Sequence, residues 1–314
     1  MAAKTVNKEC IFVTGANGFI GKNTRKQLLK DNFYVISGIR PKSLNKNFES
    51  SELRYFDLAT PFSTDLSNVD VVIHLAGIAH KFSDVTSQEY YKGNCDATLE
   101  LAKTALKFGV KRFIYLSSIG VNGSPSTDVF TEESTPNPHN DYALSKLQAE
   151  KGLLDIALNS DMEVVIIRPP LVYGQGAPGN FAKLVKLLRS ELPLPFGNVK
   201  NKRSFCGIHN LTSFLSLCCD IEQTPLASNQ VFLIADNEVI STPTFLARIS
   251  DAINRQSFQI AFPVRLLSFL FRLFGQQNLA DSLMLDLEIS IAKAELLLGW
   301  KPSFSMKEQL FDID

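Results

Sequence analysis

A glycine triplet close to the start of the chain constrains the fold more than any other feature. Gly15, Gly18 and Gly21 stand three residues apart in VTGANGFIG, after an apolar run and at the start of a helix-like stretch. Side chains at these positions would obstruct a tight turn or the approach of a ligand, and free N–H groups at a helix N-terminus bind a pyrophosphate. A spaced triplet alone is weak evidence, because turns need glycine anyway. Placed between a first strand and a first helix, it predicts a dinucleotide site.

Short apolar runs alternate with amphipathic stretches through the first half of the chain. Nearly continuous apolar strands separated by helices are typical of a parallel sheet that is covered on both faces. The expected strands are residues 10–15, 34–40, 53–58, 70–77, 112–118 and 163–170, and the expected helices include residues 19–31 and 96–109. The pattern therefore predicts an α/β fold with a doubly wound parallel sheet.

The second half of the chain is organised differently. After the last expected strand, strands and helices no longer alternate regularly. The chain continues with segments rich in proline and glycine and with irregularly spaced helices. Loops of this kind can hold a substrate against a rigid sheet. We expect a first domain of residues 1–170, joined by roughly residues 205–235, and a smaller C-terminal α/β domain of residues 171–204 and 236–314.

Charge and cysteine content limit the partners and the compartment. Lys and Arg together number 32, and so do Asp and Glu, so no net field favours nucleic acid or an acidic membrane. The five cysteines form no C-x-x-C pair and show no metal-ligand spacing, which predicts free thiols, no metal site and a cytoplasmic location. Residues 1–15 contain no long apolar segment, so we expect no signal peptide. The apolar residues 261–275 are too few to span a bilayer, and we expect a helix buried between the domains.

The end of the second expected strand normally contacts the adenosine ribose of a dinucleotide. An acidic side chain there would bind both ribose hydroxyls and repel a 2′-phosphate, whereas a basic side chain would attract that phosphate. The sequence has no acid at this point, and Arg40 and Lys42 follow the strand directly. This favours NADP over NAD, with two ordinary solvated cations as the alternative interpretation.

Other strand ends offer further cofactor contacts. Asp57, after the third strand, would suit the adenine amino group, although a surface-loop Asp is nearly as common. The stretch HLAG, residues 74–77, ends the fourth strand with small residues where a cofactor must pass closely. We expect His74 itself to be structural.

A tyrosine and a lysine provide the candidate reactive groups. Tyr142 and Lys146 stand four residues apart, on one face of an expected helix. A phenol with a pKa near ~10 is a poor base at neutral pH, but a lysine cation and a positive nicotinamide both favour its phenolate. Such a pair can pass a proton to or from a sugar oxygen while hydride moves at the attached carbon.

These features together resemble the extended short-chain dehydrogenase/reductase family of NAD-dependent sugar-nucleotide epimerases, dehydratases and reductases. The resemblance covers nearly the whole chain. The motifs that carry it are the glycine triplet, HLAG, Ser118, the Tyr142-x-x-x-Lys146 pair, RPPLVYG at residues 168–174 and LGWKP at residues 298–302. It implies a Rossmann-like domain that binds NAD(P), a smaller domain that binds a nucleoside-diphosphate sugar, and a Ser–Tyr–Lys triad.

The resemblance also assigns roles to individual residues. Ser118 matches the family's catalytic Ser/Thr, and Asn94 matches an asparagine that supports the site. For the sugar nucleotide, Asn180 and Arg203 match diphosphate contacts, although an arginine that often precedes LGW in related sequences is missing. The full set of expected cofactor contacts is Gly15, Asn17, Gly18, Phe19, Ile20, Gly21, Arg40, Lys42, Asp57, Leu58, Leu75, Ala76, Gly77, Asn94, Tyr142, Lys146 and Pro169.

The residues after Ser118 bear on the reaction type. In the 4,6-dehydratases of the family that the chain resembles, the two corresponding residues look like an Asp-Glu pair, because elimination of water requires an acid and a base beyond the tyrosine. Here they are Ile119 and Gly120. Dehydration is therefore disfavoured, and hydride chemistry at the sugar C4 remains.

Three functions fit these residues. The first is NADPH-dependent reduction of a UDP-4-keto-hexose, an N-acetylated 6-deoxy sugar for a bacterial surface polysaccharide such as O-antigen. The second is a UDP-glucose or UDP-N-acetylglucosamine 4-epimerase, which retains its cofactor and usually uses NAD. The third is a non-catalytic NADP-binding redox sensor, and such proteins characteristically lack the tyrosine and the lysine. The resemblance also implies a homodimer formed by the helices near Asn94 and Tyr142.

Overall fold

The computed structural model describes residues 9–40, 52–79, 85–123, 125–126, 128–311 and 313. The chain divides into two compact units. Unit 1 comprises Met1–Ser118, Asn140–Arg168 and Thr212–Phe232. Unit 2 comprises Ile119–His139, Pro169–Leu211 and Leu233–Asp314.

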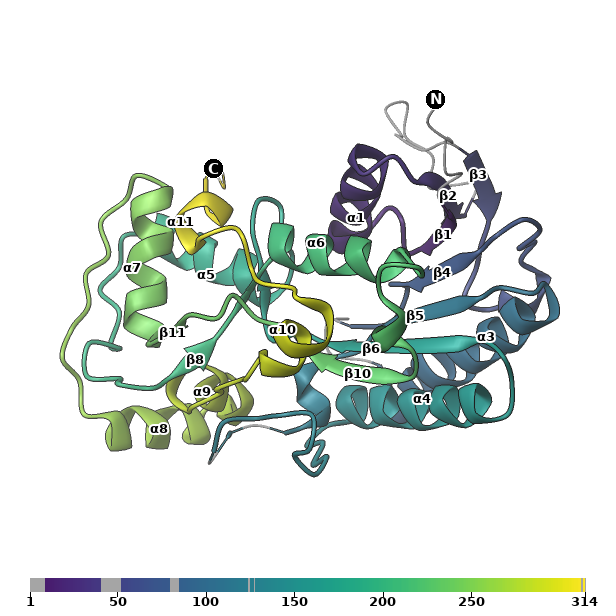
Figure 1. Ribbon diagram of the computed structural model, residues 1–314. Coiled ribbons are helices and arrows are strands. Elements are labelled where there is room, and N and C mark those ends of the chain that lie inside the picture. The colour runs from purple at the N-terminus through teal and green to yellow at the C-terminus, as the bar shows by residue number, and fades with distance from the viewer. Residues whose placement is uncertain are drawn as a thin grey trace, which may run out of the picture. The chain divides into compact units, whose positions relative to one another are not determined.

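Unit 1 is built on a seven-stranded sheet with the strand order β10-β6-β5-β4-β1-β2-β3 (Figure 1). The strands are β1 Cys10–Thr14, β2 Tyr34–Ile39, β3 Glu52–Tyr55, β4 Val71–His74, β5 Arg112–Leu116, β6 Glu163–Arg168 and β10 Gln230–Leu233. The pairings of β1 with β2 and β4, of β2 with β3, and of β5 with β4 and β6 are all parallel. The predicted α/β fold with a doubly wound, Rossmann-like sheet is confirmed.

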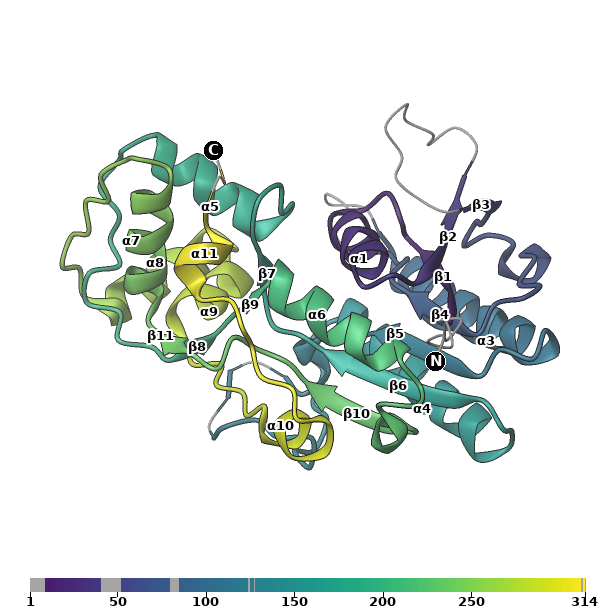
Figure 2. The ribbon, with the colours of Figure 1, turned by 45° about the horizontal axis from the view of Figure 1, so that its top comes forward.

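Helices cover both faces of this sheet. Figures 1 and 2 show α1 and α6 on one face and α3 and α4 on the other. The helical elements associated with unit 1 are α1 Phe19–Lys30, η2 Pro61–Ser63, α2 Ser87–Tyr91, the π-helix η3 Lys92–Asp96, α3 Ala97–Lys107, α4 Asp141–Leu158, α6 Ile208–Cys219, whose first turn belongs to unit 2, and η5 Pro225–Ala227. The order reverses at β1, where β2 and β4 flank the first strand, and dinucleotides bind at such a switch point in open α/β sheets.

The buried core of unit 1 explains why the apolar runs became strands. Phe12, Val72 and Phe113 come from adjacent strands and share one cluster with Leu101 of α3 and Leu153 of α4. Each of these side chains is fully buried. Strands covered on both faces lose contact with water on both sides, so their sequences are apolar almost throughout. The edge strand β10 was missed because it is only four residues long and half of it is partly exposed.

Unit 2 contains short strands and several helices. Its two-stranded sheets pair β11 with β8 and β7 with β9. The elements are η4 Ile119–Val121, β7 Val172–Tyr173, α5 Asn180–Arg189, β8 Arg203–Ser204, β9 Cys206–Gly207, β11 Val239–Ile240, α7 Thr242–Ala252, α8 Val264–Leu273, α9 Gln277–Met284, α10 Ala292–Leu298 and α11 Met306–Gln309. Aromatic packing joins several of these elements: the rings of Phe205 and Phe245 stack at 3.9 Å, and Tyr173 contacts both.

The prediction of a buried helix within residues 261–275 was wrong. The helix α8 forms there, but Leu267 is its only buried residue. Leu266, Phe269 and Leu273 are 47%, 59% and 68% exposed. The apolar residues of this segment lie on more than one side of the helix, so packing of one side leaves the others in water. Within the described ranges, no helix combines the length and apolar character needed to cross a bilayer.

Candidate active site

The glycine triplet forms the loop between β1 and α1. Gly15 has φ +64°, and a Cβ atom there would lie 2.8 Å from the backbone N of Ala76. A Cβ on Gly21 would lie 2.2 Å from the Gly15 carbonyl oxygen, which no side chain could tolerate. Gly18 is the N-cap of α1, so the free N–H groups of the first turn follow directly. This loop has the close backbone packing and the helix N-terminus that a pyrophosphate site requires.

The end of β4 is fixed beside this loop by hydrogen bonds. The Thr14 hydroxyl accepts from the backbone N–H groups of Leu75 and Ala76 at 3.1 Å. The same hydroxyl lies 2.8 Å from Nδ1 of His74, whose Nε2 lies 3.0 Å from the hydroxyl of Thr98. Burial, reinforced by the Lys146 charge, lowers the pKa of His74 to about 3. His74 is therefore a neutral residue that orders the strand ends, as the sequence led us to expect.

The predicted ribose and adenine contacts lie at the ends of β2 and β3. Arg40 follows β2 and is exposed, whereas Lys42 lies outside the described residues. Asp57 and Leu58 follow β3 and are partly buried, and the Asp57 carboxylate accepts from the backbone N–H of Ala59 at 3.0 Å. Arg40 is thus placed as the sequence predicts, at the strand end next to β1.

Asn94 connects the end of β4 to the helix that carries the reactive pair. Its Oδ1 accepts from the Ile78 backbone N–H at 2.7 Å, and its Nδ2 donates to the Ile78 carbonyl and to the Ser145 hydroxyl. A Cβ on Gly77 would lie 3.0 Å from Asn94 Oδ1 and 3.6 Å from Lys146 Nζ. Asn94 lies in the π-helix η3, an irregularity that frequently occurs at functional sites. Gly77, Asn94 and Lys146 are therefore brought together.

Ser118, Tyr142 and Lys146 meet at the carboxyl end of β5. Asn140 caps α4 by accepting from the Ala143 backbone N–H, so Tyr142 and Lys146 fall in the first two turns of this helix. The Ser118 and Tyr142 side chains share a hydrogen bond. The Lys146 ammonium donates to the Leu116 carbonyl at 2.9 Å and lies 4.5 Å from the ring centre of Tyr115. The three residues predicted to be catalytic are thus adjacent.

Burial sets the protonation of the reactive pair. It raises the pKa of Tyr142 to about 12, although the hydrogen bond with Ser118 lowers it and the nearby Tyr90 raises it further. Burial also lowers the pKa of Lys146 to about 8, with the Glu150 carboxylate acting in the opposite direction. At neutral pH the phenol is protonated and the lysine is a cation. This is the state in which tyrosine can donate a proton to a substrate oxygen.

A buried ion pair beneath the site was missed by the sequence analysis. Glu150 and Arg168 are 2% and 5% exposed, and Arg168 donates through Nε at 3.0 Å and through Nη2 at 2.5 Å to the two carboxylate oxygens. The Ser117 hydroxyl donates to Glu150 as well. Glu150 lies one helical turn after Lys146, so its position after the Tyr–Lys pair was a usable signal. The pair joins α4, the end of β6 and the residue that precedes Ser118.

The predicted substrate contacts Asn180 and Arg203 belong to unit 2, as do Ile119 and Pro169, whereas the predicted cofactor contacts Asn17, Phe19 and Ile20 belong to unit 1. Ile119 is buried and apolar, and its N–H donates to the Pro169 carbonyl at 3.0 Å. Asn180 is exposed at the first turn of α5. Arg203 is 8% exposed and donates to the Leu285 carbonyl at 2.7 Å, and burial lowers its pKa to about 10. An apolar side chain at position 119 cannot act as the additional acid or base of a dehydratase.

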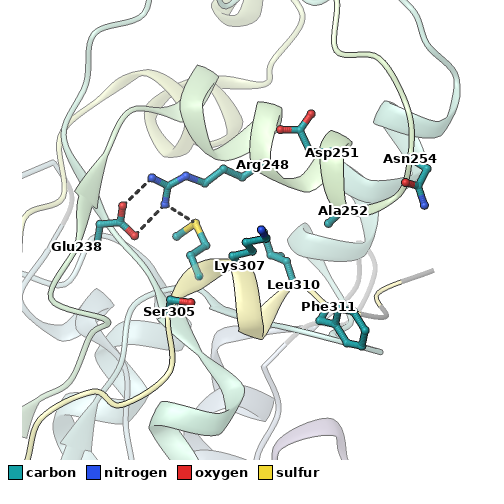
Figure 3. Close-up of a pocket in the computed structure, with 10 residues that line it drawn as sticks. Glu238, Arg248, Asp251, Ala252, Asn254, Ser305, Lys307, Leu310 and Phe311 are labelled. Atoms are coloured by element: carbon teal, nitrogen blue, oxygen red, sulfur yellow. Dashed lines mark hydrogen bonds and ion pairs between the residues drawn. The ribbon is translucent and has the colours of Figure 1, made fainter.

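A pocket of about 910 Å³ in unit 2 contains none of the predicted site residues (Figure 3). Arg248 of α7 lies in it and pairs with both carboxylate oxygens of Glu238, at 2.7 and 2.8 Å. The side chain of Arg248 also contacts the sulfur of Met306 at 3.4 Å. The guanidinium is thus engaged within the protein.

The buried lysine predicts a pH dependence of catalysis. The charged form of Lys146 favours the phenolate and contacts the Leu116 carbonyl, and it is lost as the pH rises through about 8. We therefore expect kcat/KM, which reports the ionisations of the free enzyme, to fall above this pH. In a Lys146→Arg variant the side chain keeps its charge, and any activity left should show no fall near pH 8. A wild-type profile that is flat from neutral pH to pH 10 would contradict this role.

Comparison with known proteins identifies the family. Residues 11–223 match the NAD dependent epimerase/dehydratase family. A UDP-glucose 4-epimerase of Vibrio cholerae is 38% identical over 309 residues, which are 95% of this chain and 92% of that protein. Among solved structures, the UDP-glucuronic acid 4-epimerase of Bacillus cereus in complex with NAD shares the fold, with a TM-score of 0.74 and 24% identity over 96% of this chain and 94% of its own. RMD of Pseudomonas aeruginosa, complexed with NADPH, has a TM-score of 0.72 and 21% identity over 96% and 97% of the two chains. The glycine loop, the Ser–Tyr–Lys cluster and the match over more than half of the chain thus lead to one conclusion: the chain belongs to the NAD dependent epimerase/dehydratase family.

Proposed function

We propose that this protein exchanges hydride between a nicotinamide dinucleotide and C4 of a UDP-sugar. The observation that carries the proposal is the hydrogen-bonded Ser118–Tyr142 pair with the buried Lys146 ammonium one helical turn away. The family match supports the cofactor, and the Vibrio relative, named as a UDP-glucose 4-epimerase, supports the substrate class. The tyrosine and lysine also argue against the non-catalytic sensor.

The residues around the glycine loop fit the cofactor. A Cβ on Gly15 or Gly21 would collide with the backbone, so only glycine permits this tight loop, and Gly18 at the N-cap leads directly into the N–H groups of the first turn of α1, which can bind a pyrophosphate. Asn94 and Lys146 adjoin Gly77, where a nicotinamide ribose would be held. When bound, the nicotinamide supplies or accepts the hydride.

The protein's own residues then handle the proton at the sugar oxygen. The Ser118 hydroxyl binds this oxygen and orients it toward Tyr142. In the reducing direction, the Tyr142 phenol donates its proton to the C4 oxygen as the C–H bond forms. The Lys146 cation stabilises the resulting phenolate, whose charge would otherwise be costly in a buried site. In the oxidising direction the same groups return the proton.

For the net reaction we propose reduction of a UDP-4-keto-6-deoxy-N-acetylhexosamine by NADPH, for surface polysaccharide synthesis. Two features favour it. Burial raises the pKa of Tyr142 to about 12, so the phenol rests in the protonated form from which reduction of a keto sugar starts. Arg40 is exposed at the end of β2, where a cation attracts a 2′-phosphate and hence the exchangeable NADPH.

The second candidate is 4-epimerisation. It is favoured by the 38% identity to the Vibrio cholerae UDP-glucose 4-epimerase over nearly the whole of both chains. An epimerase uses the same three catalytic residues twice, first to oxidise C4 and then to reduce it from the other face. It would hold NAD tightly through both steps. The homodimer and the cytoplasmic location stay predictions for either candidate.

A substrate test separates the two candidates. We expect the purified protein to oxidise NADPH with a UDP-4-keto-6-deoxy-N-acetylhexosamine, one hydride for each sugar reduced. Loss of NADPH absorbance and the mass of the sugar product measure this, with a Tyr142→Phe variant as the control. If the protein instead interconverts UDP-glucose or UDP-N-acetylglucosamine with the C4 epimer without added reductant, the epimerase proposal replaces the reductase.

A cofactor test concerns the strand end after β2. Removal of both charges in an Arg40→Ala/Lys42→Ala variant is expected to weaken NADPH binding by about tenfold or more, because each charge-assisted hydrogen bond contributes roughly 1.5–3 kcal/mol. NADH binding should change little, since NADH lacks the 2′-phosphate. Titration of both cofactors by fluorescence measures the difference, and an Arg189→Ala variant on α5 serves as a surface-charge control. Equal losses for the two cofactors would show that these residues do not select NADP.

A further inference from the structure

One side of the helix α8 carries an exposed apolar stripe. Leu266, Phe269 and Leu273 follow the i, i+3, i+7 spacing of a single helix face and are 47%, 59% and 68% exposed. Phe274, the C-cap residue of α8, adds a ring that is 74% exposed. Figure 1 shows α8 at the edge of unit 2, beside α9. We name these four side chains, with Arg265 and Arg272, the α8 face.

The other side of α8 accounts for its packing within unit 2. Leu267 is 5% exposed, and the hydroxyl of Ser268 contacts the sulfur of Met284 in α9 at 3.8 Å. Leu267 lies one position after Leu266, which turns it by roughly 100° around the helix. The helix is therefore anchored by one side while the larger apolar side chains point into water.

The charged residues of α8 itself are all of one sign. The sequence contains no Asp or Glu between Asp251 and Asp281, whereas this interval includes three arginines. Arg265 and Arg272 are exposed and seven residues apart, so both lie along one flank of the apolar stripe. Arg272 Nε donates to the side-chain oxygen of Gln277 at 2.7 Å, and the Gln277 amide donates in turn to Asp281 of α9 at 2.5 Å. The α8 face thus combines apolar side chains with a flank of two exposed arginines.

We propose that the α8 face docks on the surface of an anionic phospholipid bilayer. A helix with aromatic and aliphatic residues on one side and arginines beside them lies in the membrane interface, where the apolar side chains enter the acyl boundary and the cations meet lipid phosphates. Charge selects this occupant over a second copy of the chain, because two α8 faces would bring four arginines together. The ten residues of α8 are too few to cross the bilayer.

This inference is independent of the proposed reaction. The overall charge balance of the chain predicts no attraction to a membrane, but α8 itself carries two arginines and no acid. A membrane-bound enzyme of this family would release its product next to the lipid surface. Catalysis in solution would continue, because none of the catalytic residues lies on α8.

Vesicle co-sedimentation of the full chain tests the proposal. Vesicles of phosphatidylglycerol with phosphatidylethanolamine should bind the protein, and vesicles of phosphatidylcholine alone should bind at least about tenfold less. A Phe269→Ser/Leu273→Ser variant should lose the binding, and an Arg265→Gln/Arg272→Gln variant should lose about tenfold. The matched controls change exposed residues elsewhere. They are Leu158→Ser/Leu296→Ser, at 82% and 83% exposure, and Lys107→Gln/Lys151→Gln.

Each other outcome overturns the proposal. If anionic vesicles do not bind the wild-type protein, or if the controls lose as much binding as the α8 variants, the α8 face is not a lipid surface. If the wild-type protein self-associates and does not bind vesicles, while the Phe269→Ser/Leu273→Ser variant is monomeric, the α8 face binds a second copy of the chain instead. Circular dichroism and turnover of each variant show whether it is folded, so loss of structure is recognised as such.

Discussion

Replacement of Tyr142 by phenylalanine is expected to lower turnover by ~10²-fold or more, the contribution of a positioned acid or base. The phenol is protonated, hydrogen-bonded to Ser118 and within the first turns of α4, so its loss removes the proton donor without removing the ring. Cofactor affinity should stay close to that of the wild type, because the glycine loop and Lys146 remain. Single-turnover kinetics and a separate cofactor titration distinguish the two effects.

An exposed tyrosine of unit 1 provides the control for this experiment. Tyr91 is 47% exposed at the end of α2. Its hydroxyl shares a hydrogen bond with the Cys95 thiol, so Tyr91→Phe removes a phenol hydroxyl whose partner is not one of the three catalytic residues. Its turnover should be that of the wild type. A Tyr142→Phe enzyme with near-normal turnover would exclude the mechanism and leave the Ser118–Tyr142 pair a structural contact.

Loss of the Glu150 charge is expected to lower the free energy of unfolding by about 3–5 kcal/mol. In Glu150→Gln the buried Arg168 guanidinium keeps its charge but has lost the carboxylate that accepts two of its hydrogen bonds. The attraction between two buried charges offsets the cost of removing each from water, and this compensation requires both charges. Because Ser117 also donates to Glu150, the loop that carries Ser118 should lose order together with stability.

Equilibrium urea unfolding measures this effect, and the chain offers a matched control. Glu100 and Lys103 form an exposed pair at 2.8 Å on α3, so Glu100→Gln should change the free energy of unfolding by less than about 1 kcal/mol. In a Glu150→Met/Arg168→Met variant both buried charges are removed, and much of the stability should return. A Glu150→Gln protein that is as stable as Glu100→Gln would show that the buried pair is not needed for the fold.

Much of the nucleotide-binding half could be predicted because its signals are local. The spacing of Gly15, Gly18 and Gly21 predicts a strand–turn–helix, since backbone sterics at φ > 0 and at close contacts depend on residues adjacent in the chain. The i, i+4 spacing likewise places Tyr142 and Lys146 on one helix face without any knowledge of the sheet. The sequence predicted six of the seven strands of this sheet but not their order, and the short edge strand β10 lacked a signal.

Local sequence patterns do not predict which residues that are distant in the chain come into contact. The sequence marked α8 as apolar, but a hydropathy pattern does not say how many sides of a helix will find a partner, and the structure leaves Phe269 and Leu273 in water. The pairing of Glu150 with Arg168 depends on the packing of α4 against β6. Burial also moves the pKa values of Tyr142 and Lys146 in opposite directions, and it comes from distant neighbours such as Tyr90 and Tyr115.

The parallel sheet, the glycine loop and the Tyr–Lys pair could be predicted because backbone sterics and helical periodicity act over a few residues. The burial of charges, the hydrogen bonds that join Asn94 to Ser145 and Ile78, and the exposure of one apolar face of α8 became known from the folded chain alone. These outcomes depend on desolvation, and a side chain is desolvated by neighbours that are distant in the chain and near only in the folded protein.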